Sequence, residues 1–452
     1  MRMTLDDIAH AMGASLDERD SRLVTRVCID SRAVQAGDLF FCIVGQNLDG
    51  HEFARQAIAQ GAAAVVASKP LDVEAPVLLV RDTTQALGRL ARAWRERSGA
   101  RVVGVTGSAG KTTLKEMLAA VLGAVGTVGK NFRNFNNQIG LPLSILELSG
   151  DEDFWVLELG ISRPGDMDEL GYVLAPDFAV VINIGPCHLE GLGSLAGVAA
   201  EKAKLLDYVR PQGFACVNAD YPLLLAEAQT RDLRQITFSG SARPADYSCL
   251  LRADSPDGYV FQVRSDQGDL SVRAPLNAHV TENMAAVVAL TLEMGFAVAD
   301  IEQGLGGYAP VVQRFVQNKV GSWVFIDDTY NANPVSMARS IQEADALARG
   351  KRLVLVLADM KDLGGDSDRA HRELGALIAT TAATHCFFSG EYAASVQSGL
   401  GGYAGTFRAV ASAEDVLQAM ARMRAEPGVM LFKGSRGCKM ENYYSYLERN
   451  WA

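Results

Sequence analysis

Short apolar runs alternate with helical patterns along most of the chain. The runs have the length of buried strands, and the stretches between them carry apolar residues at helical spacing. This alternation is typical of mainly parallel sheets with helices on both faces. The apolar runs lie at residues 62–67, 77–80, 102–106, 154–159, 178–184, 323–326, 353–357, 386–388 and 429–432. We therefore expect an α/β protein.

Changes in this alternation predict three domains. Residues 1–95 predict a small α/β unit, at whose end a helix runs from Thr84 to Arg97. Residues 96–310 predict a central domain with a mainly parallel sheet, and residues 311–452 show an alternation typical of a Rossmann-like domain. Because three rigid bodies can close on one another, we expect the active site in a cleft between them.

Residues 236–276 depart from this pattern. Thr, Val, Tyr and Leu alternate with polar residues there, and Asp257-Gly258 and Gln267-Gly268 are turn signals. We expect antiparallel hairpins that are appended to the parallel sheet of the central domain. Helices are expected between residues 280 and 306.

Composition and charge limit the partners. The chain has 452 residues, of which 48% are hydrophobic, and this is ample for packed cores. A net charge of -10 argues against a nucleic-acid surface or a basic membrane patch. Small anions held in local basic clefts are the ligands that this balance favours.

Targeting and cysteine patterns point to the cytoplasm. The N-terminus lacks the apolar core of a signal peptide, and no later apolar run approaches the roughly 20 residues of a membrane span. The seven cysteines are scattered and show neither CxxC nor zinc-site spacing, so we expect reduced, buried thiols. Nothing in the sequence demands more than a monomer.

The segment from Val102 to Thr113 carries the strongest chemical signal. An apolar run breaks there into the Gly-rich turn Gly107-Ser108-Ala109-Gly110, which Lys111, Thr112 and Thr113 follow. Small residues let consecutive backbone N–H groups point at phosphate oxygens, and the lysine adds a positive charge. The hydroxyl after the lysine can coordinate Mg²⁺. The pattern predicts an ATP site at the beginning of a helix.

This turn differs from the strict Walker A pattern. That pattern places a glycine five residues before Gly110, where this chain has Val105. The match is to a shorter form, GxxGK[ST], which begins at Gly107. The phosphate chemistry is unchanged, but the family is a narrower one.

Five segments, in order along the chain, resemble the Mur ligases of bacterial cell-wall synthesis. The segments are Asp30–Arg32 with Gly37–Phe40 and Asp49–Phe53; Thr106–Thr113; Asn134–Pro142; Asp327–Pro334; and Lys433–Gly437. They span nearly the whole chain. The last three favour the family member that adds D-alanyl-D-alanine.

The resemblance implies an ATP-dependent amide ligase in peptidoglycan precursor synthesis. Such an enzyme joins D-alanyl-D-alanine to UDP-N-acetylmuramoyl-tripeptide through an acyl phosphate, and it releases ADP and phosphate. Amide formation needs the carboxylate oxygen to become a leaving group, and phosphorylation achieves this. Because both reactants are anionic, cations must shield the γ-phosphoryl group while the protein positions them.

The resemblance assigns the catalytic centre to Lys111, Glu158, His188 and Lys202. Lys111 neutralises the β- and γ-phosphates, while Thr112, Glu158 and His188 are implied as Mg²⁺-site residues. Glu158 and His188 follow apolar runs, and the carboxyl ends of parallel strands are where open α/β sheets bind ligands. The alternatives are an exposed strand-end carboxylate and a loop histidine that bonds to backbone.

Lys202 aligns with a lysine that carries a carbamate in this family. A carbamate formed from carbon dioxide reverses the charge of the side chain, so it can bind a metal ion or hold its ligands. We hypothesise that Lys202 is carbamylated and belongs to the metal site. A surface lysine on a solvated helix is the alternative, since Lys204 stands where related chains commonly have Glu.

Further ATP contacts are implied by the same resemblance. They are Asn137, Asn283, Arg314, Asp328 and Asn331. The amide of Asn283 offers both a donor and an acceptor to the adenine edge. The resemblance implies that His279 belongs to the same adenine pocket. Gln313 takes the place of the glycine that usually precedes the arginine.

Two groups of residues are expected to bind the substrates. In the first domain, Ser31, Arg32, Asp49 and His51 are expected to face the uridine diphosphate, since pyrophosphate needs a cation and hydrogen-bond donors. In the third domain, Tyr330 and Asn333 are expected near the dipeptide. Lys433 and Arg436 are expected to bind its carboxylate, the arginine by a two-pronged contact.

Two other functions compete with this one. A sister ligase would add one amino acid to a shorter UDP-muramoyl peptide, or glutamate to folate, but the segment Tyr330–Pro334 speaks against it. A nucleotide-gated binding module without catalysis would keep the Gly-rich turn alone. The presence of Glu158, His188 and Lys202 argues against such a module.

Overall fold

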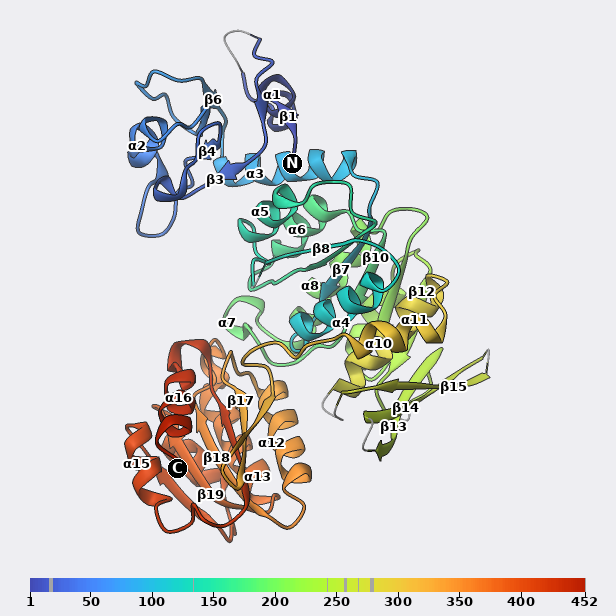
Figure 1. The fold of residues 1–452 in the computed structure, drawn as a ribbon, viewed down its shortest axis with the longest axis vertical. Coiled ribbons are helices and arrows are strands. Elements are labelled where there is room, and N and C mark those ends of the chain that lie inside the picture. The colour runs from blue at the N-terminus through green and yellow to red at the C-terminus, as the bar shows by residue number, and fades with distance from the viewer. Residues whose placement is uncertain are drawn as a thin grey trace.

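The chain folds into three α/β bodies arranged in a row (Figure 1). The structure is a computed structural model, and it describes residues 1–15, 19–132, 134–241, 243–255, 258–266, 268–276 and 280–451. The expected α/β class is confirmed. None of the helices in these described ranges combines the length and the apolar character that crossing a membrane requires.

The N-terminal body is built on a small parallel sheet with the strand order β3-β4-β5-β6. Its strands are β3 (Val27–Cys28), β4 (Leu39–Phe41), β5 (Ala64–Ala67) and β6 (Val77–Leu79), and an antiparallel pair is formed by β1 (Met3–Thr4) and β2 (Leu23–Val24). Its helices are α1 (Leu5–Met12), α2 (Ala54–Ala59) and α3 (Thr83–Arg97).

Helix α3 ties the N-terminal body to the central one. It contacts α1 on one side, and α5 (Gly140–Glu147) and α6 (Asp166–Leu174) of the central body on the other. Arg95 near its end is fully buried and pairs with Asp177 at 2.8 Å. The expected domain limit at residue 95 thus falls within α3, which belongs to both bodies.

The central sheet has the strand order β15-β14-β13-β12-β11-β10-β7-β9-β8. It is parallel from β8 to β13 and antiparallel from β13 to β15. Its strands are β7 (Arg101–Thr106), β8 (Val128–Lys130), β9 (Phe154–Glu158), β10 (Phe178–Val181), β11 (Phe214–Asn218), β12 (Gln235–Ser239), β13 (Tyr247–Ser255), β14 (Gly258–Ser265) and β15 (Gly268–Ala274). The expected hairpins are confirmed in β13 to β15.

The first strand of the hairpin segment belongs to the parallel part of the sheet. This strand, β12, was expected among the hairpins but pairs parallel with both β11 and β13. The chain therefore crosses over between β12 and β13, which are parallel, and the antiparallel part begins only where β13 pairs with β14. Of the turn signals, Asp257 and Gln267 lie outside the described residues.

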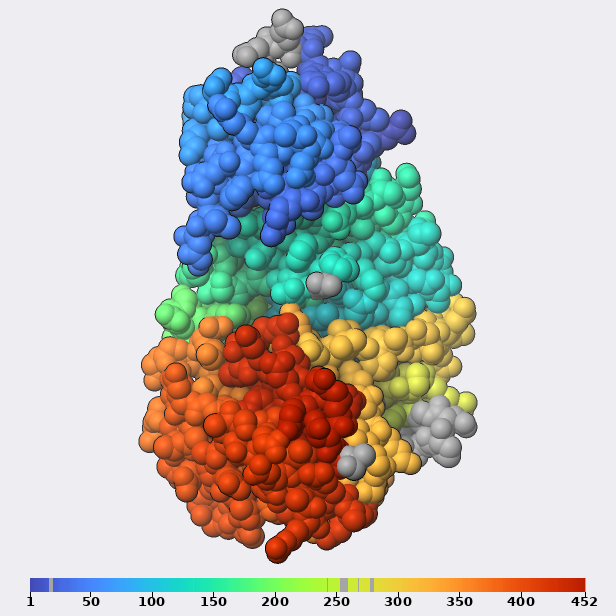
Figure 2. Space-filling view, turned by 60° about the vertical axis from the view of Figure 1, so that its left-hand side comes forward, coloured from blue at the N-terminus to red at the C-terminus, as the bar shows by residue number. Residues whose placement is uncertain are grey.

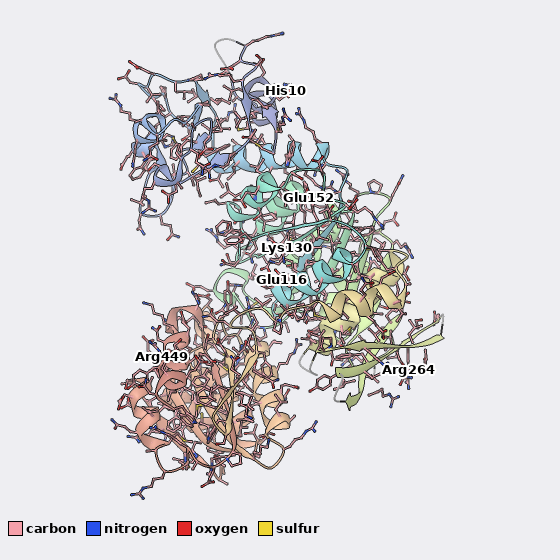
Figure 3. The ribbon with its side chains drawn as sticks, in the orientation of Figure 1. His10, Glu116, Lys130, Glu152, Arg264 and Arg449 are labelled. Atoms are coloured by element: carbon pink, nitrogen blue, oxygen red, sulfur yellow. The ribbon has the colours of Figure 1, made fainter. Side chains whose placement is uncertain are left out.

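Helices cover both faces of the central sheet. One face packs with α4 (Lys111–Gly123), α10 (Thr281–Glu293) and α11 (Val298–Gly306), and the opposite core includes α5, α6 and α8 (Leu195–Ala203). The remaining helices are α7 (Leu189–Leu192) and α9 (Pro222–Gln229). Figure 3 shows Glu116 on α4 beside Lys130 at the end of β8, and these two side chains form an ion pair.

The C-terminal body contains a sheet with the order β16-β17-β21-β18-β19-β20. Only the pairing of β16 with β17 is antiparallel among the pairings described. The strands are β16 (Val316–Val320), β17 (Trp323–Asp328), β18 (Arg352–Ala358), β19 (Ala383–Ser389), β20 (Thr406–Ala409) and β21 (Gly428–Lys433); the helices are α12 (Pro334–Ala348), α13 (Ser367–Ala379), α14 (Ala393–Gly399), α15 (Ala413–Ala419) and α16 (Met440–Asn450). This arrangement confirms the expected Rossmann-like pattern.

The topology brings several strand ends together. Strands β10, β7 and β9 are neighbours, so the segments after their carboxyl ends meet at one edge of the central sheet. The carboxyl ends of β17 and β21, at Asp328 and Lys433, are paired in the same way. Figure 2 shows the orange and red C-terminal body pressed against the central body, with the blue N-terminal body at the other end.

Candidate active site

A polar cavity of about 350 Å³ lies between the central and C-terminal bodies. Most of the residues predicted from the sequence line it. They are Gly107, Ser108, Ala109, Gly110, Lys111, Thr112, Thr113, Asn137, Glu158, His188, Lys202, Asn283, Arg314, Asp328, Tyr330, Asn331, Asn333 and Lys433. Segments separated by more than 300 residues thus meet in one place.

The Gly-rich turn leaves β7 and begins α4. Gly110 stands directly before the helix with a φ of 78°, a left-handed conformation that favours glycine. A Cβ at this position would lie 2.9 Å from Oδ1 of Asn283, so the Asn283 amide would have to shift to admit one. The Lys111 ammonium donates to the Gly107 carbonyl at 2.8 Å, which holds it over the turn.

Glu158 is fixed at the end of β9. Thr112 Oγ1 donates to its Oε2 at 2.7 Å, and Asn136 Nδ2 donates to its Oε1 at 2.5 Å. The side chain of Asn131 bonds both the N–H and the carbonyl of Glu158, at 3.1 and 3.0 Å. The carboxylate is buried and not an exposed strand end, and it lies beside the hydroxyl that was expected to bind Mg²⁺.

His188 and Lys202 also line the cavity. Burial, with the charges of Lys111 and Lys202, lowers the pKa of His188. Lys202 is only 1% exposed, and burial lowers its pKa to about 8. It is therefore not the solvated surface lysine of the alternative interpretation.

Lys204, two residues after Lys202, forms ion pairs with two carboxylates. Its ammonium lies 2.6 Å from Asp168 and 3.0 Å from Glu201. Within the described ranges, no three His, Cys, Asp or Glu side chains are grouped so that they could hold a metal ion by themselves. A metal ion here would need oxygens from a nucleotide, from Thr112 or from a modified Lys202.

The C-terminal body contributes a buried ion pair. Lys433 Nζ lies 2.5 Å from Asp328 Oδ2 and donates to the Asn331 carbonyl at 3.1 Å, while Ser340 also donates to Asp328. Burial lowers the pKa of Lys433 although Asp328 opposes this. The pair links the ends of β17 and β21, so the charge of Lys433 is already matched in this structure.

Arg314 reaches the Gly-rich turn from the linker after α11. Its Nη2 donates to Thr112 Oγ1 at 3.4 Å, and its guanidinium lies 3.8 Å from the centre of the Tyr330 ring. Gln313 and Phe315 on either side have φ angles of 63° and 56°. The left-handed conformation at Gln313 explains why glycine is usual there.

Arg436 lies just outside the cavity. Its backbone N–H donates to Asn331 Oδ1 at 3.2 Å, and its guanidinium lies over the Tyr330 ring at 5.7 Å from the ring centre. The guanidinium also pairs with Glu441 at 3.4 Å. Its expected contact with a dipeptide carboxylate stays a prediction.

The predicted residues of the N-terminal body are not brought to this cavity. Ser31 donates to Gln56, and the 80% exposed Arg32 pairs with Asp30 at 2.7 Å. His51 is buried between Asp49, at 2.5 Å, and the N–H of Ser68, at 2.9 Å, so it holds a turn together. A ligand that contacts both this body and the cavity must bridge the two.

Several functional candidates were not predicted from the sequence. Asn136 holds Glu158, and the buried Asn183 accepts from two backbone N–H groups of the Gly-rich turn. Glu282 and Arg339 pair at 2.7 Å between the central and C-terminal bodies. The charge of Glu282 within the apolar pattern of α10 was a usable signal, whereas nothing near Arg339 marks it. His279 lies outside the described residues.

Three family models match the chain in succession. The catalytic domain model of the Mur ligase family covers residues 23–95, the Mur ligase middle domain covers 105–291, and the Mur ligase glutamate ligase domain covers 313–436. A relative from Bacillus subtilis, UDP-N-acetylmuramoyl-tripeptide--D-alanyl-D-alanine ligase, is 34% identical over 98% of this chain and 97% of its own length.

The chain belongs to the Mur ligase family.

Solved structures of Mur ligases agree with this fold. MurF from Acinetobacter baumannii matches with a TM-score of 0.90 at 28% identity, over 100% of this chain and 99% of that chain. The MurF ligase of Thermotoga maritima, solved in complex with ADP, matches with a TM-score of 0.84 at 27% identity, over 95% and 98% of the two chains.

Mur ligases are ATP-dependent ligases that form amide bonds, and this chain is an enzyme of that class. The alternative of a binding module without catalysis is therefore wrong. ATP and Mg²⁺ are general requirements of the Mur ligases.

Proposed function

We propose that this Mur ligase joins D-alanyl-D-alanine to UDP-N-acetylmuramoyl-tripeptide, with ATP cleaved to ADP and phosphate. The observation that carries the proposal is the similarity over nearly the full length of the chain to ligases named for this reaction. The cavity supports it, because a phosphate-binding turn, a fixed carboxylate and cations from two bodies meet there.

The reaction begins when the tripeptide carboxylate attacks the γ-phosphorus of ATP. The Gly107–Thr113 turn and Lys111 bind the phosphates, and Arg314, whose guanidinium contacts Thr112, adds a second cation. An acyl phosphate forms and ADP leaves. The amine of the dipeptide then attacks the acyl carbon, and the resulting tetrahedral intermediate releases phosphate and a proton.

The residues around Thr112 fit a Mg²⁺ ion. Thr112 and Glu158 offer a hydroxyl and a carboxylate oxygen that are hydrogen-bonded at 2.7 Å, and hard cations prefer such oxygen ligands. Mg²⁺ bound there would neutralise charge on the terminal phosphates. Asn136 holds the carboxylate itself, and Asn131 holds the backbone of Glu158.

Lys202 is proposed to carry a carbamate. The ammonium would first lose a proton; the neutral amine would then attack the carbon of carbon dioxide, forming an N–C bond and releasing a second proton to give the carbamate anion. Burial beside the cavity favours this product, because burial lowers the pKa of the Lys202 ammonium and so makes the neutral, nucleophilic amine available. The anionic product, together with His188, would complete the donor set for a cation.

The N-terminal body is proposed to hold the UDP end of the substrate. Ser31 and Arg32 lie in this body, whereas the reacting carboxylate must reach Lys111 in the cavity. A UDP-linked peptide can bridge the two bodies, because its nucleotide and its peptide lie at opposite ends of the molecule. We place the reaction in the cytoplasm, where ATP is available.

A phosphate-release assay tests this function. The purified chain receives ATP, Mg²⁺ and UDP-N-acetylmuramoyl-tripeptide, and either D-alanyl-D-alanine or single amino acids are added. We expect release with the dipeptide only. Release with one amino acid and a shorter UDP-muramoyl peptide would identify a sister ligase instead, and the absence of stimulation by any amine would contradict the proposal.

A further inference from the structure

Glu282 is a buried carboxylate that no step of the proposed reaction uses. It lies in the first turn of α10 and is 8% exposed. Its Oε1 accepts from Asn218 Nδ2 at 3.0 Å and from the Tyr221 hydroxyl at 2.9 Å. Its Oε2 accepts from Asn183 Nδ2 at 2.8 Å and lies 2.7 Å from Arg339 Nη2. Both oxygens are thus fully engaged.

Arg339 comes from a different body than the other members of this network. Asn183, Asn218 and Tyr221 belong to the central body with Glu282, whereas Arg339 lies on α12 of the C-terminal body. The three central partners are neutral, and burial together with Glu282 raises the pKa of Tyr221, so its hydroxyl keeps its proton. The charge of Glu282 is therefore balanced only when α12 is docked, as far as the described residues go.

Asn183 links this carboxylate to the Gly-rich turn. Its Oδ1 accepts from the N–H groups of Ser108 and Ala109, both at 2.9 Å, and its Nδ2 also donates to the Ala109 carbonyl at 3.1 Å. A carboxylate can only accept hydrogen bonds, so Glu282 forces the NH₂ group of Asn183 toward itself. The amide oxygen must then face the two N–H groups of the turn.

We propose that Glu282 is a positioning residue that couples docking of the C-terminal body to the conformation of the phosphate-binding turn. Docking brings Arg339 to Glu282, Glu282 fixes the amide of Asn183, and Asn183 holds Ser108 and Ala109. The inference rests on the proposed function only in that the turn binds ATP. Coupling of this kind is reciprocal, so a nucleotide that orders the turn also favours docking.

The Glu282–Arg339 pair borders a second cavity. This cavity has a volume of about 380 Å³ and is lined by Thr281, Arg339 and Gln342 among others. When α12 moves away, this space admits water to Glu282 and the Arg339 interaction is lost. A partly buried ion pair at a movable interface therefore favours the docked state more than it favours folding.

The test uses the full chain and four variants. They are Arg339→Met, Glu282→Gln, the double variant, and Gln342→Met as a matched control one turn further along α12. The first measurement is the Kd of a non-hydrolysable ATP analogue. We expect each single variant to bind about 10-fold more weakly, the double variant to be no weaker than either single one, and the control to match the wild type.

Two outcomes of this measurement would overturn the proposal. Losses that multiply to about 100-fold in the double variant would mean that Arg339 contacts the nucleotide independently of Glu282. Unchanged affinity in both single variants would mean that the pair has no link to the turn. Failure of the wild type to bind the analogue would contradict the proposed function instead.

The second measurement keeps the inference testable if Glu282→Gln does not fold. Small-angle scattering of the nucleotide-free protein reports whether the C-terminal body is docked. We expect Arg339→Met to increase the radius of gyration and Arg339→Lys to restore most of the wild-type value. An unchanged radius in Arg339→Met would overturn the proposal, because a nucleotide contact or a purely structural role would leave docking of the free protein unaffected.

Discussion

Asn333 of the C-terminal body donates from Nδ2 to the Ser108 carbonyl of the Gly-rich turn at 3.0 Å. The same side chain caps α12, since its Oδ1 accepts from the N–H of Ser336 at 2.9 Å. One residue therefore begins a helix and also contacts the phosphate-binding turn of the neighbouring body.

Asn333→Ser separates these two roles. Serine keeps the cap of α12 but is too short to reach Ser108. We expect kcat/KM to fall by about 10-fold, the effect of losing one positioning hydrogen bond, while the free energy of unfolding stays within about 0.5 kcal/mol. Steady-state kinetics and urea unfolding measure the two quantities.

Asn333→Asp provides the comparison for this prediction. It also keeps the cap, but it turns a carboxylate toward the Ser108 carbonyl and the phosphate site. We expect a larger loss than in Asn333→Ser because the new charge repels ATP. Wild-type kcat/KM in both variants would show that the contact has no part in catalysis.

A left-handed backbone at Gln313 predicts an unusual response to glycine. The φ of 63° costs a residue with a Cβ roughly 1 kcal/mol, and Gln313→Gly removes this cost while it adds about 0.4–1 kcal/mol of unfolded-chain entropy. We expect a net change in the free energy of unfolding of less than about 0.5 kcal/mol. Gln313→Val should destabilise by about 1–2 kcal/mol, because a β-branched residue tolerates this conformation poorly.

Val312→Gly is the matched control for Gln313. Val312 is 76% exposed and its φ is not among the positive ones, so glycine there should cost unfolding free energy without relieving strain. Urea unfolding compares the variants. An equal loss at both positions would contradict strain at Gln313.

The sequence predicted those parts of the site that lie within short motifs. Lys111, Glu158 and His188 follow apolar runs, and the rule that ligands bind at the carboxyl ends of parallel strands placed them together. The same rule works for Asp328, the last residue of β17. These residues need only local patterns and a general topology to be found.

The residues that the sequence did not predict depend on contacts between distant segments. Asn183, Glu282 and Arg339 form one network, yet 99 positions separate the first two and no motif joins them. Conversely, Asp49 and His51 stand in a family-like segment, but here they bond to each other and to Ser68. Burial and partner choice are set by tertiary packing, which a linear pattern does not contain.

A carbamate on Lys202 predicts rescue by small acids. Lys202→Ala should lower kcat by about 10²–10³-fold, the usual effect of removing one preorganised charged group, and acetate should restore part of the activity. Lys204→Ala is the matched control, since it removes a neighbouring lysine that pairs with Asp168 and Glu201 outside the cavity. We expect its kcat to stay near the wild-type value.

Carbon-13 NMR gives a readout of this prediction that does not depend on activity. Wild-type protein supplied with ¹³C-labelled bicarbonate should show a carbamate signal that is missing in Lys202→Ala and present in Lys204→Ala. Full activity of Lys202→Ala without added acid, or the same signal in both variants, would contradict carbamylation of Lys202.

His371 predicts a loss of stability on acidification. Its Nε2 accepts from the N–H of Met360 at 3.0 Å, its Nδ1 lies 2.6 Å from the Ser367 carbonyl, and its ring stacks on Tyr392. This geometry requires a neutral ring, and burial lowers the pKa of His371 below its ordinary value of 6.5. Below pH 6.5 the unfolded chain therefore binds more protons than the folded one, so the free energy of unfolding falls as the pH falls.

Replacing His371 should remove this pH dependence. At pH 7.5 we expect His371→Gln to be less stable than the wild type by about 1–3 kcal/mol, because glutamine has no ring to stack on Tyr392 or to bond the Met360 N–H and the Ser367 carbonyl from opposite edges. The difference should shrink between pH 6.5 and 5, since only the wild type must give up a neutral histidine. His10→Gln, on α1 in Figure 3, is the control, because His10 is exposed. A difference between His371→Gln and wild type that stays constant with pH in urea unfolding would contradict a neutral, buried His371.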